Sequence, residues 1–324
     1  MIFAKQTKRE ITRRGIQISL GYLWLLDGLL QLQRQMFSHS FATQVIAPAG
    51  NGQPIVVYGP INFEIHMLLL HPAVFDAMFA IIQLTLAVLI LNKRTVRIGL
   101  ISSIIWGLAV WWMGEGFGGL LNGQTSLLFG APGAAILYVL IALAVLPHQT
   151  TQTNRRARKP AYWLPVCWTV LWVGGAIYQL LPGQNTASDI ASSIAANAGG
   201  NTPGWLNELD RHTASFILGK GFLFVLTLVL VQAAIGLFVL FSVKMRKVAI
   251  GGGIVLSLAF WFVGQSLGTY FSGLATDPNT APLFILLGIA ILGAQRFNYH
   301  KLFRDASKFL NRIGDMYEAP PIAE

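Results

Sequence analysis

Apolar and polar residues follow one another along this chain in long blocks. Eight apolar blocks are separated by segments that are basic or rich in glycine, proline and asparagine. Apolar runs of about 18 residues or more indicate helices that cross a bilayer. The pattern therefore predicts eight membrane spans, at about residues 16–33, 72–91, 98–115, 132–146, 161–181, 214–243, 248–264 and 282–294.

These blocks form two series of four. Sliding the sequence by 150 residues places Trp111 on Trp261 and Gly118 on Gly268, and it places the Ala-Pro pair 131–132 on 281–282 without a gap. An internal repeat of this kind sets the architecture. We expect an all-α, polytopic membrane protein with two four-helix repeats. Its predicted parts are a first repeat, 1–147, a basic linker, 148–160, a second repeat, 161–294, and an amphipathic tail, 295–324.

Basic residues predict the orientation. With eight spans, 20 of the 23 Lys and Arg residues fall on one side of the membrane, and the exceptions are Arg34, Arg211 and Lys220. Short loops that are rich in Lys and Arg stay on the cytoplasmic side. We therefore expect a protein of the cytoplasmic membrane with both termini inside the cell. Each repeat has an even number of spans, so the two enter the membrane in the same direction and are parallel.

Composition agrees with a membrane protein. The chain is 54% hydrophobic and 11% charged, whereas about 25% of the residues in an ordinary soluble domain are charged. The net charge of +10 follows from the orientation, so the expected partner is the lipid bilayer and not nucleic acid. The single cysteine, Cys167, excludes an intrachain disulfide and any cysteine-based metal site.

Ionisable residues inside spans are the first candidates for function, because they are expensive in a bilayer and face the bundle interior. All of them fall toward the outer half of the predicted membrane, and the spacing of Asp27 and Gln31 allows one helix face. In the second repeat the counterparts are Gly175, Gln179 and Gln265, which carry no charge. We expect one polar site in the first repeat, formed by Asp27, Gln31, Asp76 and Glu115, with Lys220 as the counter-charge.

The specific expectation is that Asp27 and Glu115 point into the bundle with their carboxyl groups within about one water-bridged contact. For Asp27 and Glu115 the alternative carries equal weight, and for Asp76 and Lys220, which are nearer helix ends, snorkelling or pairing is favoured. Carboxyl and amide groups in spans also join helices or cap their ends, and Glu115 stands where a span ends.

A metal site is a weaker hypothesis. Part of the first outer loop, 62–70, predicts a short helix at the membrane interface that carries Glu64 and His66, with His71 directly after it. The spacing matches no recognised ligand pattern, so ordinary interfacial polar residues are the favoured interpretation. Neither a haem site within the bilayer nor a phosphate loop nor a nucleophile with its base is indicated.

The layout of each half resembles that of DoxX-like membrane proteins. A first span is followed by a long outer loop, two spans joined by a short basic turn, and a fourth span. Residues 71–99 carry most of the likeness, and the stretches GEGFGG (114–119) and GAPGA (130–134) resemble motifs of bacterial multi-span proteins. The resemblance implies a quinone-linked redox subunit, since some DoxX-like proteins are linked to quinone-coupled sulfur oxidation.

Three functions therefore remain open. The outer site suggests binding or transport of a small polar solute or ion, and the resemblance implies the quinone-linked subunit. A structural or assembly role beside other membrane subunits is the third. No catalytic residue is predicted, no cofactor is predicted from the residues, and a quinone enters only through the resemblance.

Overall fold

A computed structural model describes residues 2–123, 125–147, 163–197 and 202–293, with side chains from residue 13 onward. The predicted linker, 148–160, and tail, 295–324, lie outside these residues. Within them every regular element is helical. The first half contains α1 (Ile2–Leu30), a π-helical turn η1 (Phe41–Ile46), α2 (Ala47–Ala49), α3 (Ile55–Leu70), α4 (Pro72–Leu91), α5 (Val96–Met113), the short turns η2 (Gly116–Gly119) and η3 (Leu127–Phe129), and α6 (Ala134–Val145).

The bundle helices of the second half follow in a similar order, but the elements between them differ, and the single turn η4 stands where the first half has η2 and η3. Two helices replace the elements between α1 and α4. It contains α7 (Trp163–Tyr178), α8 (Ala187–Asn197), α9 (Gly204–Lys220), α10 (Phe222–Phe238), α11 (Val243–Val263), the turn η4 (Ser266–Ser272) and α12 (Thr280–Gly293).

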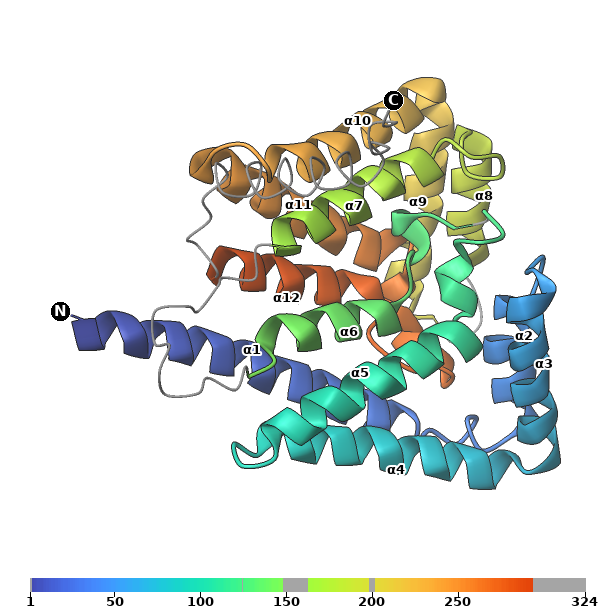
Figure 1. Cartoon of the computed structure of the whole chain (residues 1–324). Helices are drawn as coiled ribbons and strands as arrows, with labels where there is room; N and C mark the ends of the chain where they lie inside the picture. Colours follow the sequence, from blue (N-terminus) through green and yellow to red (C-terminus); the bar gives the residue numbers. More distant parts are fainter. Residues whose placement is uncertain (1, 124, 148–162, 198–201, 294–324) are drawn as a thin grey trace, which may run out of the picture.

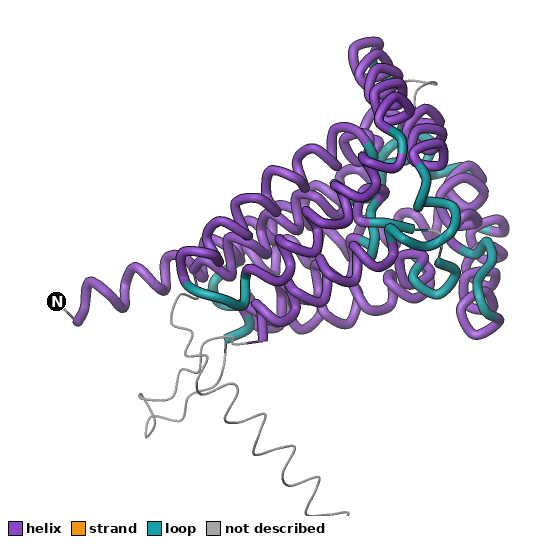
Figure 2. Tube along the Cα trace, turned by 90° about the horizontal axis from the view of Figure 1, so that it is seen from above, coloured by secondary structure: helices purple, strands orange, loops and turns teal. Residues whose placement is uncertain are grey.

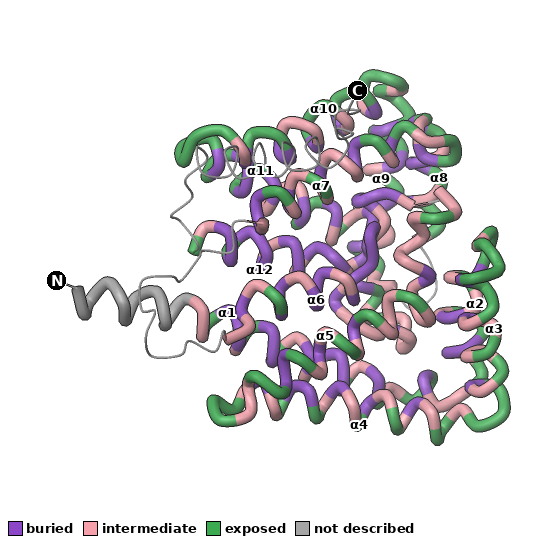
Figure 3. The backbone as a smooth tube through the Cα atoms, viewed as in Figure 1, coloured by how far each residue is buried: buried purple, intermediate pink, exposed green. Residues whose placement is uncertain are grey.

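Helices α1, α4, α5, α6, α7, α10, α11 and α12 lie side by side and form a bundle (Figure 1). Helices α2, α3, α8 and α9 run across one end of it, as the view from above also shows (Figure 2). Equivalent pairs pack together in the two halves: α1 with α4 and α5 with α6, then α7 with α10 and α11 with α12. Helices α6 and α12 meet at the centre, where buried residues concentrate (Figure 3).

Each predicted apolar block overlaps one of the eight bundle helices, and α4 has the predicted bounds of 72–91. Helix α4, helix α5 and the segment Val243–Ser272 are long and apolar enough to cross a membrane. The bent pair α9–α10 would be a fourth such segment if it is counted as one. The helices at the centre are shorter, and α6 has 12 residues.

The predicted sixth span, 214–243, is wrong at its start. Its first part belongs to α9, which meets α10 at an angle of 102°. The break falls at Gly221, whose backbone angles of φ +55° and ψ −139° suit glycine and few other residues. Lys220 is consequently the last residue of an exposed cross-helix and does not lie within the bundle.

The predicted gapless register is also wrong beyond Gly268. The indole Nε1 of Trp111 donates to the carbonyl of Pro132 at 2.7 Å, and that of Trp261 donates to the carbonyl of Pro278 at 2.8 Å. Trp261 follows Trp111 by 150 residues, but Pro278 follows Pro132 by 146. The loop of the second half is four residues shorter, although in both halves the carbonyl that closes the turn belongs to the second residue before the next helix. The Ala-Pro pairs do not correspond.

Polar side chains close the bundle at the end opposite α3 and α9. Arg14 donates to the carbonyl of Ile90 at 3.0 Å, and Gln17 donates to that of Val145 at 2.9 Å. These carbonyls belong to the last turns of α4 and α6, where cationic and donor groups satisfy the free acceptors of a helix end. The cationic groups and the helical layer of α3 and α9 therefore lie at opposite ends.

Close packing at Gly175 gives a test of this arrangement. A Cβ atom there would lie 2.3 Å from Cδ1 of Leu127, whereas a Cβ atom at the adjacent Gly174 would meet nothing within 4 Å. We expect Gly175→Ala to lower the stability of the purified protein by about 1–3 kcal/mol through overpacking. Gly174→Ala is the matched control and should be neutral or stabilising, because alanine favours helix. Thermal unfolding in detergent measures both, and equal effects would contradict the packing.

Candidate functional site

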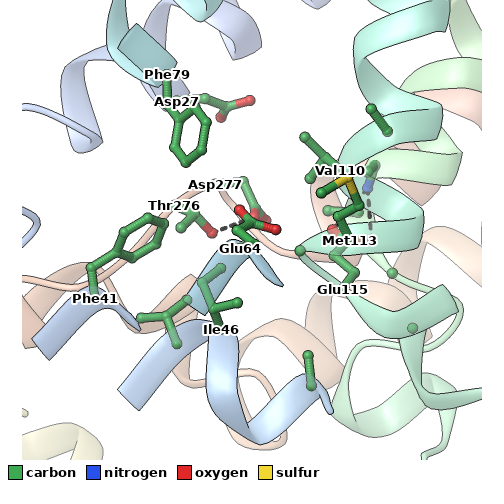
Figure 4. A pocket seen from close by; sticks show the side chains of 18 of the residues that line it. Asp27, Phe41, Ile46, Glu64, Phe79, Val110, Met113, Glu115, Thr276 and Asp277 are labelled. Carbon is green, nitrogen blue, oxygen red and sulfur yellow. Dashed lines mark hydrogen bonds between the residues drawn. The ribbon is translucent and has the colours of Figure 1, made fainter. Parts of the chain in front are cut away.

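A cavity lies in the first half of the described chain, beneath η1, α2 and α3. Its volume is about 650 Å³, and α1, α4, α5, α6 and the loop that precedes α12 complete its walls. Four carboxyl side chains line it, together with aromatic, methionine and amide side chains (Figure 4). The four are Asp27, Glu64, Glu115 and Asp277.

The layer of α2 and α3 is fastened to the turn after α5. Gln53 donates from Nε2 to the carbonyl of Gly116 at 2.9 Å, and Trp112 donates to the carbonyl of Val56 at 3.3 Å. A Cβ atom on Gly116 would lie 2.5 Å from the carbonyl oxygen of Ala49. The cover of the cavity is thus held by backbone contacts that need glycine at this position.

Asp27 reaches the cavity from α1. It is 2% exposed, and its Oδ1 has no hydrogen-bond partner among the described residues. The hydroxyl of Tyr138, from α6, lies close enough to interact with this carboxyl group, although no hydrogen bond of full geometry joins them. Tyr138 is held in place by Trp24, whose ring centroid lies 4.4 Å away. The buried Oδ1 of Asp27 therefore lines the cavity beside the packed rings of Tyr138 and Trp24.

Glu115 reaches the cavity from the turn after α5. Its Oε1 accepts the backbone N–H of Ala135 at 3.0 Å, which caps the start of α6. In the second half Oε1 of Gln265 accepts the N–H of Ala281 at 3.2 Å. Glu115 thus caps α6, and a neutral side chain, Gln265, does the same for α12 in the other half. The negative charge of Glu115 is not needed for the cap.

Asp277 is the acidic residue that sequence reasoning missed. It belongs to the second half, yet it lines the cavity of the first. Its Oδ1 accepts the N–H of Asn279 and its Oδ2 accepts the hydroxyl of Thr276, both at 2.7 Å. Gln33 of the first half fixes the same loop by donating to the carbonyl of Ala275 at 3.3 Å. When Pro278 is aligned with Pro132, Asp277 directly precedes the proline whose carbonyl accepts the tryptophan N–H in this half.

In the second half a loop of the first half fills the position beside the counterpart of Asp27. Leu127 packs against Gly175, the counterpart of Asp27, and its carbonyl accepts from Nε2 of Gln265 at 3.2 Å. Gln179, the counterpart of Gln31, donates to the carbonyl of Gln184. Each half therefore inserts a loop into the other. The first half contributes an apolar loop with Leu127, and the second half contributes an acidic loop with Asp277.

The remaining predicted acidic residue is tied to the site indirectly. Asp76 is buried in α4 and accepts a hydrogen bond from Gln31, which lines the cavity. Asp76 itself is not part of the lining.

The predicted counter-charge is wrong. Lys220 is exposed, and its Nζ lies 5.5 Å from the ring centroid of Phe216 on the same helix. The bend at Gly221 directs α9 away from the bundle axis, which takes Lys220 out of reach. No lysine, arginine or histidine occurs among the described residues that line the cavity. The carboxyl groups therefore lie near one another without a cation of the protein between them.

The weaker metal hypothesis is not supported by the described residues. Glu64 lines the cavity, but the ring of the exposed His66 pairs with the carbonyl of Asn62 at 2.7 Å. Over the described part of the chain, no group of three or more His, Cys, Asp or Glu residues is placed to hold a metal ion.

Burial and mutual repulsion favour the protonated forms of these acids. Burial, and next the charge of Asp277, raise the pKa of Glu115 to about 8, while the amides of Ala135 and Ala134 act in the opposite direction. Burial also raises the pKa of Asp277, against hydrogen bonds from Thr276 and Asn279. The pKa of Glu64 rises to about 7 through burial. The cavity thus holds carboxyl groups that exchange protons near neutral pH.

Several buried polar atoms of the cavity wall have no partner among the described residues. Acceptors predominate. The atoms are Oδ1 of Asp27, Oε2 of Glu64, Oε1 of Gln83, Nε1 of Trp106 and the hydroxyl of Tyr138. Buried polar atoms in proteins are nearly always paired, so a cluster of free ones in a cavity indicates a place for water or a ligand.

Comparisons of the chain with protein-family models, with curated proteins and with solved structures found no match. The geometry of the cavity is therefore the basis on which a function can be argued.

Glu115→Gln tests the electrostatics of the cavity. Because the pKa of Glu115 is near 8 in the folded protein and near 4.5 unfolded, the folded state holds more protons between these values. Stability should consequently fall as pH rises through this window, by at most about 1.4 kcal/mol per pH unit from this group. Glu115→Gln keeps the cap, as Gln265 does, and should remove that part of the slope.

Thermal unfolding from pH 5 to pH 8 measures this slope. The control is Asp189→Asn, since Asp189 lies in the first turn of α8, outside the cavity lining, and accepts a hydrogen bond from Thr186. An unchanged pH dependence in the Glu115 variant would show that this carboxyl is not buried among like charges.

Proposed function

We propose that the chain is an integral protein of the cytoplasmic membrane, crossed by its eight bundle helices as two parallel repeats. The outward faces of the bundle support this placement. Ile81 of α4, Ile105 of α5 and Leu230 of α10 are exposed although they are large and apolar, which is costly in water and favourable in lipid.

The short central helices are compatible with a crossing. Helix α6 has 12 residues and a length of about 18 Å, less than the roughly 30 Å of a hydrocarbon core. It lies at the centre of the bundle, against α5 and α12. Irregular backbone at membrane depth is tolerated where protein surrounds it, and the segment with η3 that precedes α6 can complete the crossing.

For the cavity, we propose binding of a small polar solute or ion as the first step of its transport. The observation that carries the proposal is the buried, unpartnered carboxylate oxygen of Asp27, which faces a space of about 650 Å³. A carboxyl group inside a membrane bundle without a partner is expensive, and such groups mark solute and ion pathways. A volume of this size matches the usual range for small-molecule sites.

The orientation places the cavity on the extracytoplasmic side. Lys93 and Arg94 in the turn between α4 and α5 are exposed, and so are Lys244 and Lys247 at the start of α11. Both basic segments are at the end of the bundle away from α3 and α9 (Figure 1). By the positive-inside rule that end is cytoplasmic, and the cavity beneath α3 then opens toward the outside.

Cysteine labelling tests this proposal. In a Cys167→Ala background, Met113→Cys places a thiol in the cavity wall and Asn92→Cys places one in the exposed turn after α4. We expect a membrane-impermeant thiol reagent to label Met113→Cys in intact cells, and Asn92→Cys only after the membrane is opened. The reversed pattern would contradict the orientation. A thiol at Met113 that reacts from neither side would contradict an open binding cavity.

A further inference from the structure

We propose that the cavity binds a small organic cation, whose ammonium group lies between the carboxyl groups and the aromatic rings of the first half. This inference rests on the proposed function and names its class of ligand. Figure 4 shows Asp27, Glu64, Glu115 and Asp277 around one space, with Phe41 and Phe79 on one side of it and Met113 on the other.

The free polar atoms of the wall call for a donor. Oδ1 of Asp27, Oε2 of Glu64 and Oε1 of Gln83 are buried acceptors that no donor among the described residues satisfies. A ligand with N–H or polarised C–H groups would satisfy them, and a ligand that offers only acceptors would not. One free donor, Nε1 of Trp106, leaves room for one acceptor on the same molecule.

The charge of the wall determines the sign of the ligand. Four carboxyl groups line the cavity, and the described lining contains no basic side chain. The pKa of Glu115 is raised by burial and next by the charge of Asp277, and an anion would add to that repulsion. A cation would instead lower the energy of every ionised form nearby, so charge complementarity excludes an anion and favours a cation.

Aromatic rings make an organic cation a better fit than a metal ion. The ring centroid of Phe79 lies 6.4 Å from that of Phe41 and 5.7 Å from that of Trp106, so the three rings form a continuous wall. Ammonium groups bind well to ring faces beside carboxylates. The acids of the described chain are too dispersed to coordinate a metal, and the volume far exceeds that of an ion.

Binding of a cation should release protons. Glu115 faces Asp277 on the loop before α12, Asp27 on α1 and the amide of Ala135 on α6. Because burial and these like charges keep Glu115 protonated up to about pH 8, a bound ammonium group would stabilise the carboxylate and displace the proton. The affinity for the cation should therefore rise between pH 6 and pH 8.

Choline and its uncharged isostere 3,3-dimethyl-1-butanol form a matched pair of probes, with n-butylamine as a second ammonium compound. Binding to the purified full-length protein can be followed by calorimetry and by the fluorescence of Trp24 and Trp106. We expect at least one ammonium probe to bind, and at least about tenfold more tightly than the neutral isostere, which corresponds to about 1.4 kcal/mol. Asp27→Asn should lose about this preference, and Asp189→Asn should keep it.

The outcomes separate this inference from the function on which it rests. Equal binding of choline and the neutral isostere would overturn the organic-cation class and leave a solute site in place. If neither ammonium probe binds while Met113→Cys is still labelled from outside, the organic-cation class is likewise overturned and a solute site remains. Protection of that thiol by sodium or calcium ions alone would assign the cavity to metal ions. If Asp27→Asn fails to fold, Phe79→Leu replaces it, and an unchanged preference for charge in that variant contradicts the aromatic site.

Discussion

A left-handed turn directly after α5 fixes where α6 begins, and most of the site depends on it. A Cβ atom on Gly118, whose φ is +62°, would lie 2.0 Å from the carbonyl oxygen of Pro132, so this position requires glycine. The close approach allows Trp111 to bond the same carbonyl and brings Glu115 onto the first amides of α6. Gly268 and Gln265 repeat the arrangement in the second half. The turn therefore explains why the carboxyl group of Glu115 lies both at the start of α6 and in the wall of the cavity.

The two halves use one backbone plan and differ in what fills the space beside their first helix. Leu127 of the first half packs on Gly175, where apolar contacts close the space. The corresponding loop of the second half carries Asp277, which is hydrogen-bonded by its own loop and leaves the space beside Asp27 open. An apolar plug contributes packing and costs no desolvation of charge, whereas a buried carboxyl group is costly and is expected where it serves a function. The asymmetry is the main structural argument for a single site.

The pattern of apolar blocks predicted the helical class and the position of each bundle helix, because helices of this kind need long runs of apolar residues. It also brought Asp27 and Glu115 to one cavity, since polar groups in apolar helices face the interior. The break at Gly221 was not predicted, because a glycine inside an apolar run marks a bend in some helices and close packing in others. Asp277 was missed for a different reason. A gapless register concealed a loop that is four residues shorter and hid its insertion into the opposite half.

The central claim is that Asp277 of the second half and Glu115 of the first share one cavity. A double-mutant cycle with Glu115→Gln and Asp277→Asn, measured as unfolding free energy at pH 8, tests it most directly. Removing either carboxyl group removes the electrostatic repulsion on the other. The change in unfolding free energy of the double variant should therefore differ from the sum of the two single changes by at least about 0.5 kcal/mol. The same cycle at pH 5, where Glu115 is protonated, should show a smaller coupling. Additive effects at pH 8, within about 0.3 kcal/mol, would contradict the shared cavity.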